Sequence, residues 1–293
     1  LALFGGKAPH QHSFVHGGVA VAPTADKINQ ALSLVHDIQD FINRCLMPDT
    51  ELIATCYDDY FHIGETPGRY LSFGLFRFGS KNNQLLWRSG VLENNRLHDV
   101  NRGLIEEDIA RAWYERATWL QPSVISPAPH KRDAYTWTKS VQYRGKHYEG
   151  GPLARMLMNG FYNGGTSTMD RIVARSAETL LIAKLMKEWL RELKPGEPPI
   201  NQKTELTHNQ ATAITDAMRG PLLHSALVQN EKVARYDIIT PTVWNFSPKD
   251  EQNNRGPAES ALVGTDIPSP ELRNVILGRI IRSFDPCISC ATH

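Results

Sequence analysis

The sequence predicts a mainly α-helical protein with a minor β component, and three stretches carry that prediction. Residues 24–46 and 168–193 each place apolar side chains three and four positions apart, which is the spacing of one helix face. Between them, residues 70–91 alternate apolar with small or polar side chains, which is the period of a strand. Because an apolar helix face must be covered, we expect a further helix layer against each long helix.

The ends of the two long helices carry recognisable signals. Thr24 is the expected N-cap of the first helix, with Asp26 in its first turn, and Pro48 lies just past the expected end. Cys45 falls on the apolar face, so we expect a small buried hydrophobic residue there. The Pro195-Gly196 pair is expected to end the second helix.

Shorter elements fill the rest of the chain. We expect, in order, a hairpin over 70–91 with turns at 80–83 and 94–95, a helix over 103–119, a helix from Pro152, an edge or extended strand over 233–244, and a last helix over 272–281. Three acidic residues at 106–108 suit the positive N-terminal end of the 103–119 helix. Pro241 restricts the 233–244 stretch to an edge. Without a repeat or a long linker, residues 1–293 are expected to form a single domain.

Composition excludes several classes of protein. The 293 residues are 41% hydrophobic and 22% charged, which is typical of a soluble globular protein. A net charge of +1 gives no electrostatic basis for nucleic acid as a partner. No apolar run approaches the roughly 20 residues of a membrane span. The first residue is Leu1, so we do not expect it to be the translated start, and an upstream part or a separate chain is expected.

The most informative stretch is a cysteine pair at 287 and 290. Asp285 and Pro286 precede it, and His293 lies three residues beyond it. Three interpretations compete: a structural zinc site that also uses His293, a redox disulfide, or half of a metal site whose other two thiolates come from another segment or chain. Four thiolates would suit nickel, iron or zinc.

This terminal motif resembles that of the large subunit of nickel–iron hydrogenases, and further motifs match in the family's order. They are Gly5-Gly6-Lys7-x-Pro9-His10, Tyr135-x-Trp137, Gly151-Pro152-Leu153-Ala154-Arg155, Ala217-Met218-Arg219-Gly220, Thr240-Pro241-Thr242-x-Trp244-Asn245, and Asp285-Pro286-Cys287-x-x-Cys290-x-x-His293. The resemblance spans the whole chain. It implies a helical-bundle core of the large-subunit type.

The resemblance also implies a catalytic centre. Cys287 would be a terminal nickel ligand and proton acceptor, and Cys290 would bridge nickel to an iron that carries carbon monoxide and cyanide. Arg219 would overhang the two metals and pair with Asp285, since a guanidinium can hydrogen-bond a diatomic ligand and stabilise developing charge. Thr242, next to Pro241 in the cofactor-binding motif, would hydrogen-bond a cyanide.

Two further sites are implied. His293, the C-terminus that a maturation protease would leave, resembles a ligand of a magnesium (or iron) ion that the backbone carbonyl of Ile238 would help to bind. His10 resembles a histidine that faces an iron–sulfur cluster of the small subunit.

The sequence departs from the family pattern in ways that bear on function. A family cysteine pair in an Arg-x-Cys-Gly-x-Cys context, which supplies the other nickel ligands, is absent, as are two N-terminal glutamates. Met218 replaces a proline and Asp216 a glutamate. The chain is therefore expected to be the C-terminal part of a large subunit, with a companion chain that supplies the other cysteines.

The expected function is reversible heterolytic oxidation of dihydrogen, with electrons passed to iron–sulfur clusters of a small subunit. The alternative is a non-catalytic relative, either a dihydrogen sensor or a metal-free subunit of a respiratory complex. Partner subunits are expected to attach the protein to a membrane, at its periplasmic or cytoplasmic face.

Overall fold

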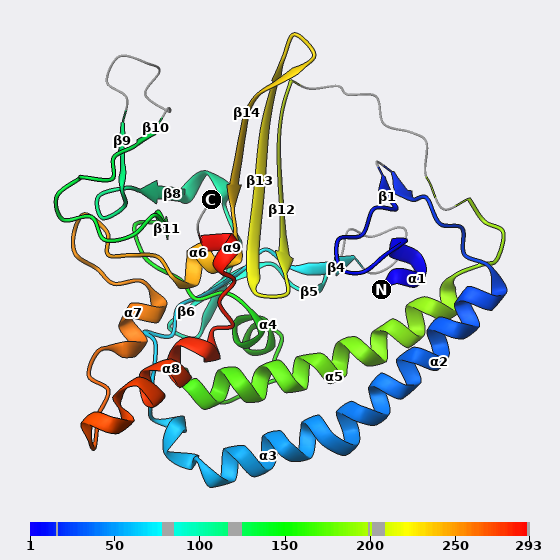
Figure 1. Ribbon diagram of the computed structural model, residues 1–293, viewed down its shortest axis with the longest axis horizontal. Coiled ribbons are helices and arrows are strands. Elements are labelled where there is room, and N and C mark those ends of the chain that lie inside the picture. Colours follow the sequence, from blue (N-terminus) through cyan, green and yellow to red (C-terminus); the bar gives the residue numbers. More distant parts are fainter. Residues whose placement is uncertain (16, 78–84, 117–124, 199, 201–208, 292–293) are drawn as a thin grey trace. The chain divides into compact units, whose positions relative to one another are not determined.

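The computed structural model describes residues 1–15, 17–77, 85–116, 125–198, 200 and 209–291. Figure 1 draws the described residues as a coloured ribbon. They divide into two compact units. The first unit comprises Leu1–Ile53 and Ser176–Asn209, and the second comprises Ala54–Arg175 and Gln210–His293. That the chain is a single domain remains a prediction.

The first unit is built on two antiparallel helices, α2 (Ala25–Phe41) and the part of α5 (Thr168–Glu192) that follows Arg175. The Thr24 hydroxyl caps α2 by accepting the Lys27 N–H at 3.3 Å. The Gln39 side-chain amide donates to the Ala183 carbonyl at 2.9 Å. Both long helices and the Thr24 cap are therefore confirmed.

The sequence predicted that the first helix ends before Pro48, and this prediction was wrong. A π-helical turn, η1 (Ile42–Leu46), follows α2 and leads directly into α3 (Met47–Cys56), with the Met47 N–H bonded to the Ile42 carbonyl. A π turn widens the helix by one residue. Pro48 then lies in the first turn of α3, where a missing N–H is tolerated. Cys45 is half-buried, so the expectation of a buried core residue was wrong.

Short elements complete the first unit. They are α1 (Ala2–Gly5), β1 (Phe14–Val15) and β2 (Gly18–Val19), the last two forming an antiparallel pair.

The second unit contains the predicted β segment. Its first strands are β3 (Tyr70–Ser72), β4 (Leu75–Arg77), β5 (Leu85–Trp87), β6 (Gly90–Glu93) and β7 (Arg96–His98). β4 pairs with β5, and β3, β6 and β7 form an antiparallel sheet in that order. Asn94 and Asn95 both adopt positive φ in the turn between β6 and β7, as predicted. The expected turn at 80–83 lies outside the described residues.

The helix predicted over 103–119 is absent from its described part. In this region the chain instead forms η3 (Arg102–Leu104), β8 (Ile105–Asp108) and β9 (Tyr114–Arg116). A separate short helix, η2 (Asp58–Phe61), lies earlier in the chain. β8 pairs with β11 (Ser140–Tyr143), all of whose residues are buried, and β9 pairs with β10 (Ile125–Pro127). Pairing with a distant buried strand thus overrides a weak local helix pattern.

A long three-stranded meander dominates the rest of the second unit (Figure 1). It comprises β12 (Gln210–Ala217), β13 (Gly220–Gln229) and β14 (Lys232–Ile239), paired in that order. β14 is the edge strand that the sequence allowed, and it ends before Pro241, which begins α6 (Pro241–Asn245). A core of buried residues lies beneath, including Leu71, Phe73, Val141, Tyr143 and Trp244.

The remaining helices are α4 (Pro152–Met158), which begins at Pro152 as predicted, α7 (Pro257–Leu262), η4 (Pro270–Leu272), α8 (Arg273–Ser283) and α9 (Ile288–Ala291). α8 buries Ile276 and Ile280 against α7. Arg175 donates to the Ser283 carbonyl at 2.6 Å, and the Arg171 guanidinium lies 3.8 Å from the centre of the Phe284 ring. These contacts fix the chain just before Asp285. None of the described helices combines the length and apolarity that crossing a bilayer requires.

Candidate metal centre

Both thiols of the cysteine pair lie on one short turn. Cys287 immediately precedes α9 and Cys290 lies within it, and the Cys290 and Ala291 N–H groups donate to the Cys287 carbonyl at 3.1 and 3.2 Å. This turn brings the two Sγ atoms to within 2.8 Å of each other. The two sulfurs are therefore close enough to contact one metal ion.

Hydroxyl groups from distant segments hold this turn in place. The Cys287 N–H donates to Thr242 Oγ1 at 3.2 Å, Thr240 Oγ1 donates to the Cys290 carbonyl at 2.8 Å, and Thr138 Oγ1 donates to the Ala291 carbonyl at 2.9 Å. Figure 1 shows α6 and α9 side by side at the base of the meander. Because the Thr242 hydroxyl accepts from the backbone, its own hydrogen stays available for donation to a ligand.

Arg219 and Asp285 meet beside the cysteine pair. Arg219 lies in the tight turn between β12 and β13, and its Nε is 2.7 Å from the Asp285 carbonyl oxygen and 3.0 Å from Asp285 Oδ2. Its Nη2 lies 3.4 Å from Asp285 Oδ1. Two groups separated by 66 residues thus form one ion pair, and both remain partly exposed.

A buried ion pair fixes the turn that carries Arg219. Arg155 Nη1 lies 3.0 Å from Asp216 Oδ2, and neither side chain has measurable exposure. The same guanidinium donates to the carbonyls of Ala217 and Met218 at 3.0 and 2.8 Å. Asp216, which stands where the family has a glutamate, therefore still provides a carboxylate for this network. Hydrogen bonds hold the backbone on the N-terminal side of Arg219.

Two glycines allow the turn to approach α4. Gly220 has φ of 129°, and a Cβ there would lie 2.8 Å from the Gly151 nitrogen. Gly151 has φ of 115°, and a Cβ there would lie 3.0 Å from the Arg219 carbonyl. Side chains at these positions would push the Arg219 turn away from the start of α4.

The two thiols differ in acidity. A hydrogen bond from the Cys290 thiol lowers the pKa of Cys287, and nearby Arg219 lowers it further. Burial is the main cause that raises the pKa of Cys290 to about 11, and its bond to Cys287 adds to the effect.

We therefore expect iodoacetamide at pH 8 to alkylate Cys287 of the metal-free protein before Cys290, because a thiolate is the reactive form. Peptide mass spectrometry over a time course would measure the order, with the exposed Cys56 as a reference for an ordinary thiol. Equal rates at 287 and 290 would contradict the assigned hydrogen bond.

The other residues singled out from the sequence lie elsewhere or outside the described chain. His10 is an exposed residue of the first unit, with φ of 57°. Ile238 lies near the end of β14, opposite His224, and Pro241 is buried at the start of α6. His293 lies outside the described residues, so its role and that of the Ile238 carbonyl remain predictions. Within the described chain, no cluster of three or more His, Cys, Asp or Glu side chains is arranged to hold a metal ion.

Sequence reasoning missed the residues that position the site. Thr240 stands next to Pro241, inside a motif that was recognised, so its position was a usable signal. Arg155 was recognised only as part of a motif, and nothing local indicated its pairing with Asp216. Thr138 gave no signal, because its bond to Ala291 spans 153 residues.

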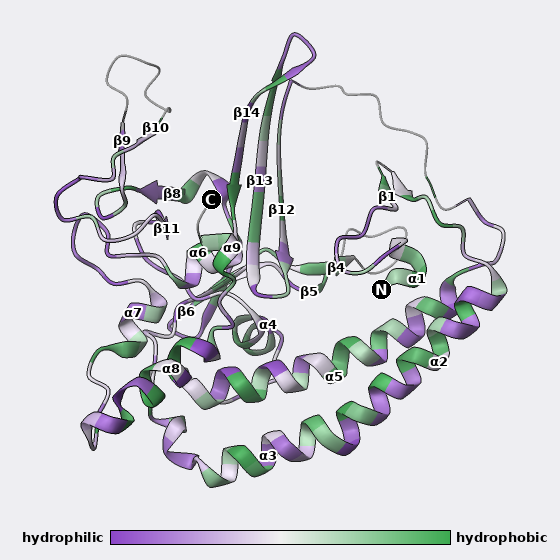
Figure 2. Ribbon diagram, in the orientation of Figure 1, coloured by the Kyte–Doolittle hydropathy of each residue, from purple (hydrophilic) through white to green (hydrophobic). Residues whose placement is uncertain are grey.

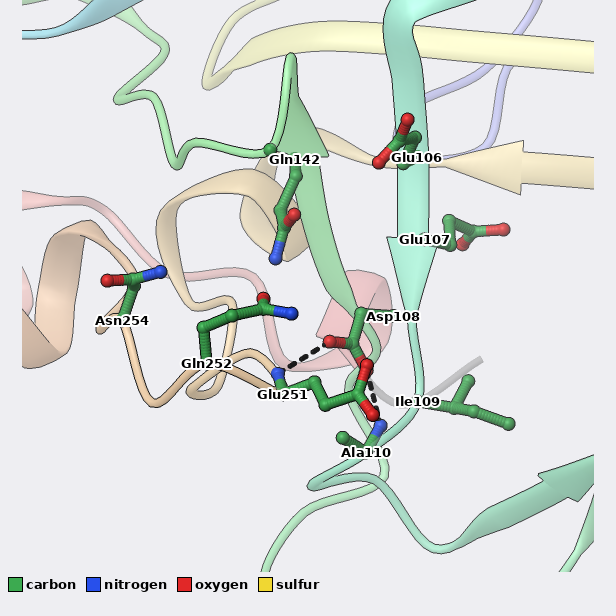
Figure 3. Close-up of a pocket in the computed structure, with 10 residues that line it drawn as sticks. Glu106, Glu107, Asp108, Ile109, Ala110, Gln142, Glu251, Gln252 and Asn254 are labelled. Atoms are coloured by element: carbon green, nitrogen blue, oxygen red, sulfur yellow. Dashed lines mark hydrogen bonds between the residues drawn. The ribbon is translucent and has the colours of Figure 1, made fainter.

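A cavity of about 770 Å³ lies apart from these residues, between β8, β11 and the loop at 251–254. Its lining includes the carboxyl groups of Glu106, Glu107, Asp108 and Glu251. Figure 3 shows Asp108 bonded to the backbone N–H groups of Ala110 and Glu251. Glu107 pairs with Lys139 at 3.0 Å. The carboxylates of Asp108 and Glu107 therefore have structural partners, and the cavity lies outside the cysteine site.

The whole chain matches one protein family. The model of the nickel-dependent hydrogenase family matches residues 1–166 and 162–293, which together cover the chain. The chain belongs to the nickel-dependent hydrogenase family.

Individual members of the nickel-dependent hydrogenase family agree with this assignment. The chain is 30% identical over 322 residues to the periplasmic NiFeSe hydrogenase large subunit of Desulfomicrobium baculatum, covering all of this chain and 62% of that protein. It is 27% identical to the Hydrogenase-2 large chain of Escherichia coli K12, of which it covers 61%. The chain thus spans about three fifths of the length of these relatives.

Solved structures match over the same extent. A structure of the NiFeSe hydrogenase of Dm. baculatum superposes with a TM-score of 0.89 at 30% identity, covering all of this chain and 65% of that chain. The Ni-Fe-Se hydrogenase of D. vulgaris Hildenborough gives a TM-score of 0.90 at 30% identity, covering all of this chain and 66% of that one. The fold is therefore that of a nickel-dependent hydrogenase large subunit.

The donor set fits the metal that the family name specifies. Two thiols lie 2.8 Å apart, and nickel is among the metals that soft sulfur ligands can bind. A cationic guanidinium lies beside the site, and it can offset the negative charge of two thiolates. Two ligands make only half of a four-coordinate site, so a complete site needs further donors.

Proposed function

We propose that this chain is the C-terminal part of a nickel–iron hydrogenase catalytic subunit that, together with a companion chain, oxidises dihydrogen reversibly to protons and electrons. One observation carries the proposal: two adjacent thiols lie beside an arginine–aspartate pair in a chain that belongs to the family. In this assignment Cys287 and Cys290 would hold nickel, and Cys290 would also hold an iron that carries carbon monoxide and cyanide. The electrons leave through iron–sulfur clusters of a small subunit.

The bound metals would supply the site at which dihydrogen is split. The chain's own residues would then act on the proton and on charge. Cys287 would accept a proton at Sγ, and the positive charge of nearby Arg219 would favour release of that proton again. Asp285 orients Arg219 through its carbonyl and carboxylate oxygens, so that the guanidinium keeps a fixed direction as charge develops.

Hydroxyl groups would complete the site. Thr242 accepts the Cys287 N–H and can donate its own hydrogen to a cyanide nitrogen. Pro241 fixes the start of α6, which sets the position of that hydroxyl. We also propose His293 and the Ile238 carbonyl as ligands of a magnesium (or iron) ion, and His10 as the residue that faces the small subunit's cluster.

The proposal is tested by metal analysis combined with mass spectrometry on the natively purified complex. We expect one nickel per complex, iron in excess, and a second polypeptide that carries a cysteine pair. Zinc or no metal would refute the catalytic assignment. Nickel and iron without dihydrogen turnover would instead favour the alternative of a dihydrogen sensor.

Replacing Arg219 by lysine should leave nickel bound but slow turnover strongly, by about tenfold or more, because an ammonium cannot reproduce the planar contact with Asp285. Dihydrogen oxidation and nickel content would be measured on the same preparation. Arg235→Lys is the matched control, since Arg235 pairs with Asp237 at 2.6 Å on the neighbouring strand β14. Equal turnover in the two variants would remove Arg219 from the mechanism.

A further inference from the structure

The first unit carries an exposed apolar stripe on α2. We use the name α2 stripe for Leu34, Ile38 and Phe41, whose spacing of four and three places them on one helix face. Their exposed fractions are 48%, 47% and 61%. Two residues of α3 are also exposed, Leu52 at 62% and Ile53 at 45%. Figure 2 shows apolar residues recurring along both helices.

The α2 stripe is separate from the face that α2 buries. Ile28, Ala31 and Val35 are the buried residues of α2. At 100° per residue, their mean direction lies about 90° around the helix from the stripe. A helix with one packing partner needs one apolar face, so a second face beside the first indicates a second partner.

Charge borders the stripe on the side away from the buried face. Asp26, Asp37 and Asp40 lie there by the same helical geometry, and Asp40 forms an ion pair with Arg44 at 3.2 Å. A segment that covers the stripe would therefore meet the carboxylate of Asp37 and the Asp40–Arg44 pair along one edge, with Lys27 in line with the stripe at its N-terminal end. Lys or Arg at the matching edge of the partner would be favoured.

We propose that the α2 stripe is the docking face for the companion chain, an inference that rests on the proposed function. The chain covers 62% and 61% of two relatives, and under the proposed function the companion carries the segment that corresponds to the rest. The occupant is a helix with apolar residues three and four apart and with basic residues on one flank. Such a helix fits the ridges that side chains four apart make on α2.

Photocrosslinking on the natively purified complex tests this surface directly. Benzoylphenylalanine in place of Phe41 should crosslink to a peptide of the companion chain, identified as the polypeptide that carries the missing cysteine pair. The matched control is the same amino acid at His36, which is exposed and about 200° around the helix from Leu34. A companion crosslink from 36 but not from 41 would overturn the proposal, as would a crosslink from 41 only within this chain or to a second copy of it.

A charge substitution gives an independent test. Ile38→Glu should reduce recovery of the companion chain about tenfold or more at equal yield of this chain, because a buried carboxylate opposes docking. His36→Glu should not change it, and far-UV circular dichroism should be alike for both. Full recovery with Ile38→Glu would refute the surface.

The two proposals fail in different ways. If the wild-type complex contains no nickel but Ile38→Glu still releases the companion, the docking surface stands and the catalytic function falls. A wild-type complex that contains nickel and the second chain, and from which Ile38→Glu does not release that chain, would refute the docking surface alone.

Discussion

Replacing Cys290 by serine should abolish dihydrogen oxidation in the assembled enzyme. A serine hydroxyl stays protonated at neutral pH and is a hard ligand, whereas the proposed site needs a soft thiolate that contacts both metals. The loss should exceed the roughly 10- to 100-fold that removing an outer hydrogen-bond partner of a metal ligand costs. Because Thr240 binds the backbone carbonyl of residue 290, the turn itself should survive the substitution.

Activity and nickel content on the same preparation would measure this effect. Cys56→Ser is the control, since Cys56 is an exposed cysteine far along the chain from the pair. Wild-type activity in the Cys290→Ser variant would disprove the ligand assignment, while loss in both variants would point to damage unrelated to the metals.

The largest effect on stability is expected for Arg155→Met. The substitution leaves Asp216 buried without its cation and frees the carbonyls of residues 217 and 218. Breaking a buried ion pair from one side typically costs about 3–5 kcal/mol. Arg219 lies in the same turn, so activity should fall as well.

Urea unfolding would measure the stability change, with Arg191→Met as control. Arg191 pairs with Glu188 at 2.9 Å on the exposed surface of α5, and such a pair contributes about 1 kcal/mol or less. If Arg155→Met lowers the free energy of unfolding no more than Arg191→Met does, the buried pair does not hold the turn.

The destabilisation at position 155 should depend on pH. Burial raises the pKa of Asp216, and Arg155 is the main group that opposes this. Without Arg155, the folded pKa rises further above the unfolded value, so the native state favours the protonated acid. The stability deficit of the variant relative to the wild type should therefore be smallest at low pH and should grow as pH rises through the folded pKa of Asp216. A deficit that grows on acidification would contradict this account.

The sequence predicted the helices and turns that depend on residues close to one another in the chain. Apolar spacing located both long helices, Thr24 marked a cap, Pro152 marked the start of α4, and Asn94-Asn95 marked a turn. It failed where distant contacts decide. Residues 105–108 form a strand because the buried residues of β11 offer a pairing edge 30 or more positions away. The helix continues past Pro48 because a π turn places that proline in a first turn.

The residues of the candidate metal centre were predicted from the sequence, but the contacts that support them were not. Cys287, Cys290, Arg219, Asp285 and Thr242 were singled out through their motifs, and the structure brings these five together in the second unit. The motifs did not reveal how the site is supported. Arg155–Asp216 and the Thr138 bond to Ala291 join positions 61 and 153 residues apart, and no periodicity within a single segment records such pairings.

The threonine anchors on the cysteine turn bear on the order of assembly. Thr138, Thr240 and Thr242 bind the backbone on both sides of the thiols, and none of these bonds uses a sulfur atom. Folding of the second unit therefore contributes to the entropic cost of ordering the two cysteines. Under the proposed assignment, a metal would bind to a turn whose backbone these hydroxyl groups already hold, unlike the sites of small zinc modules, which stay unfolded without their ion.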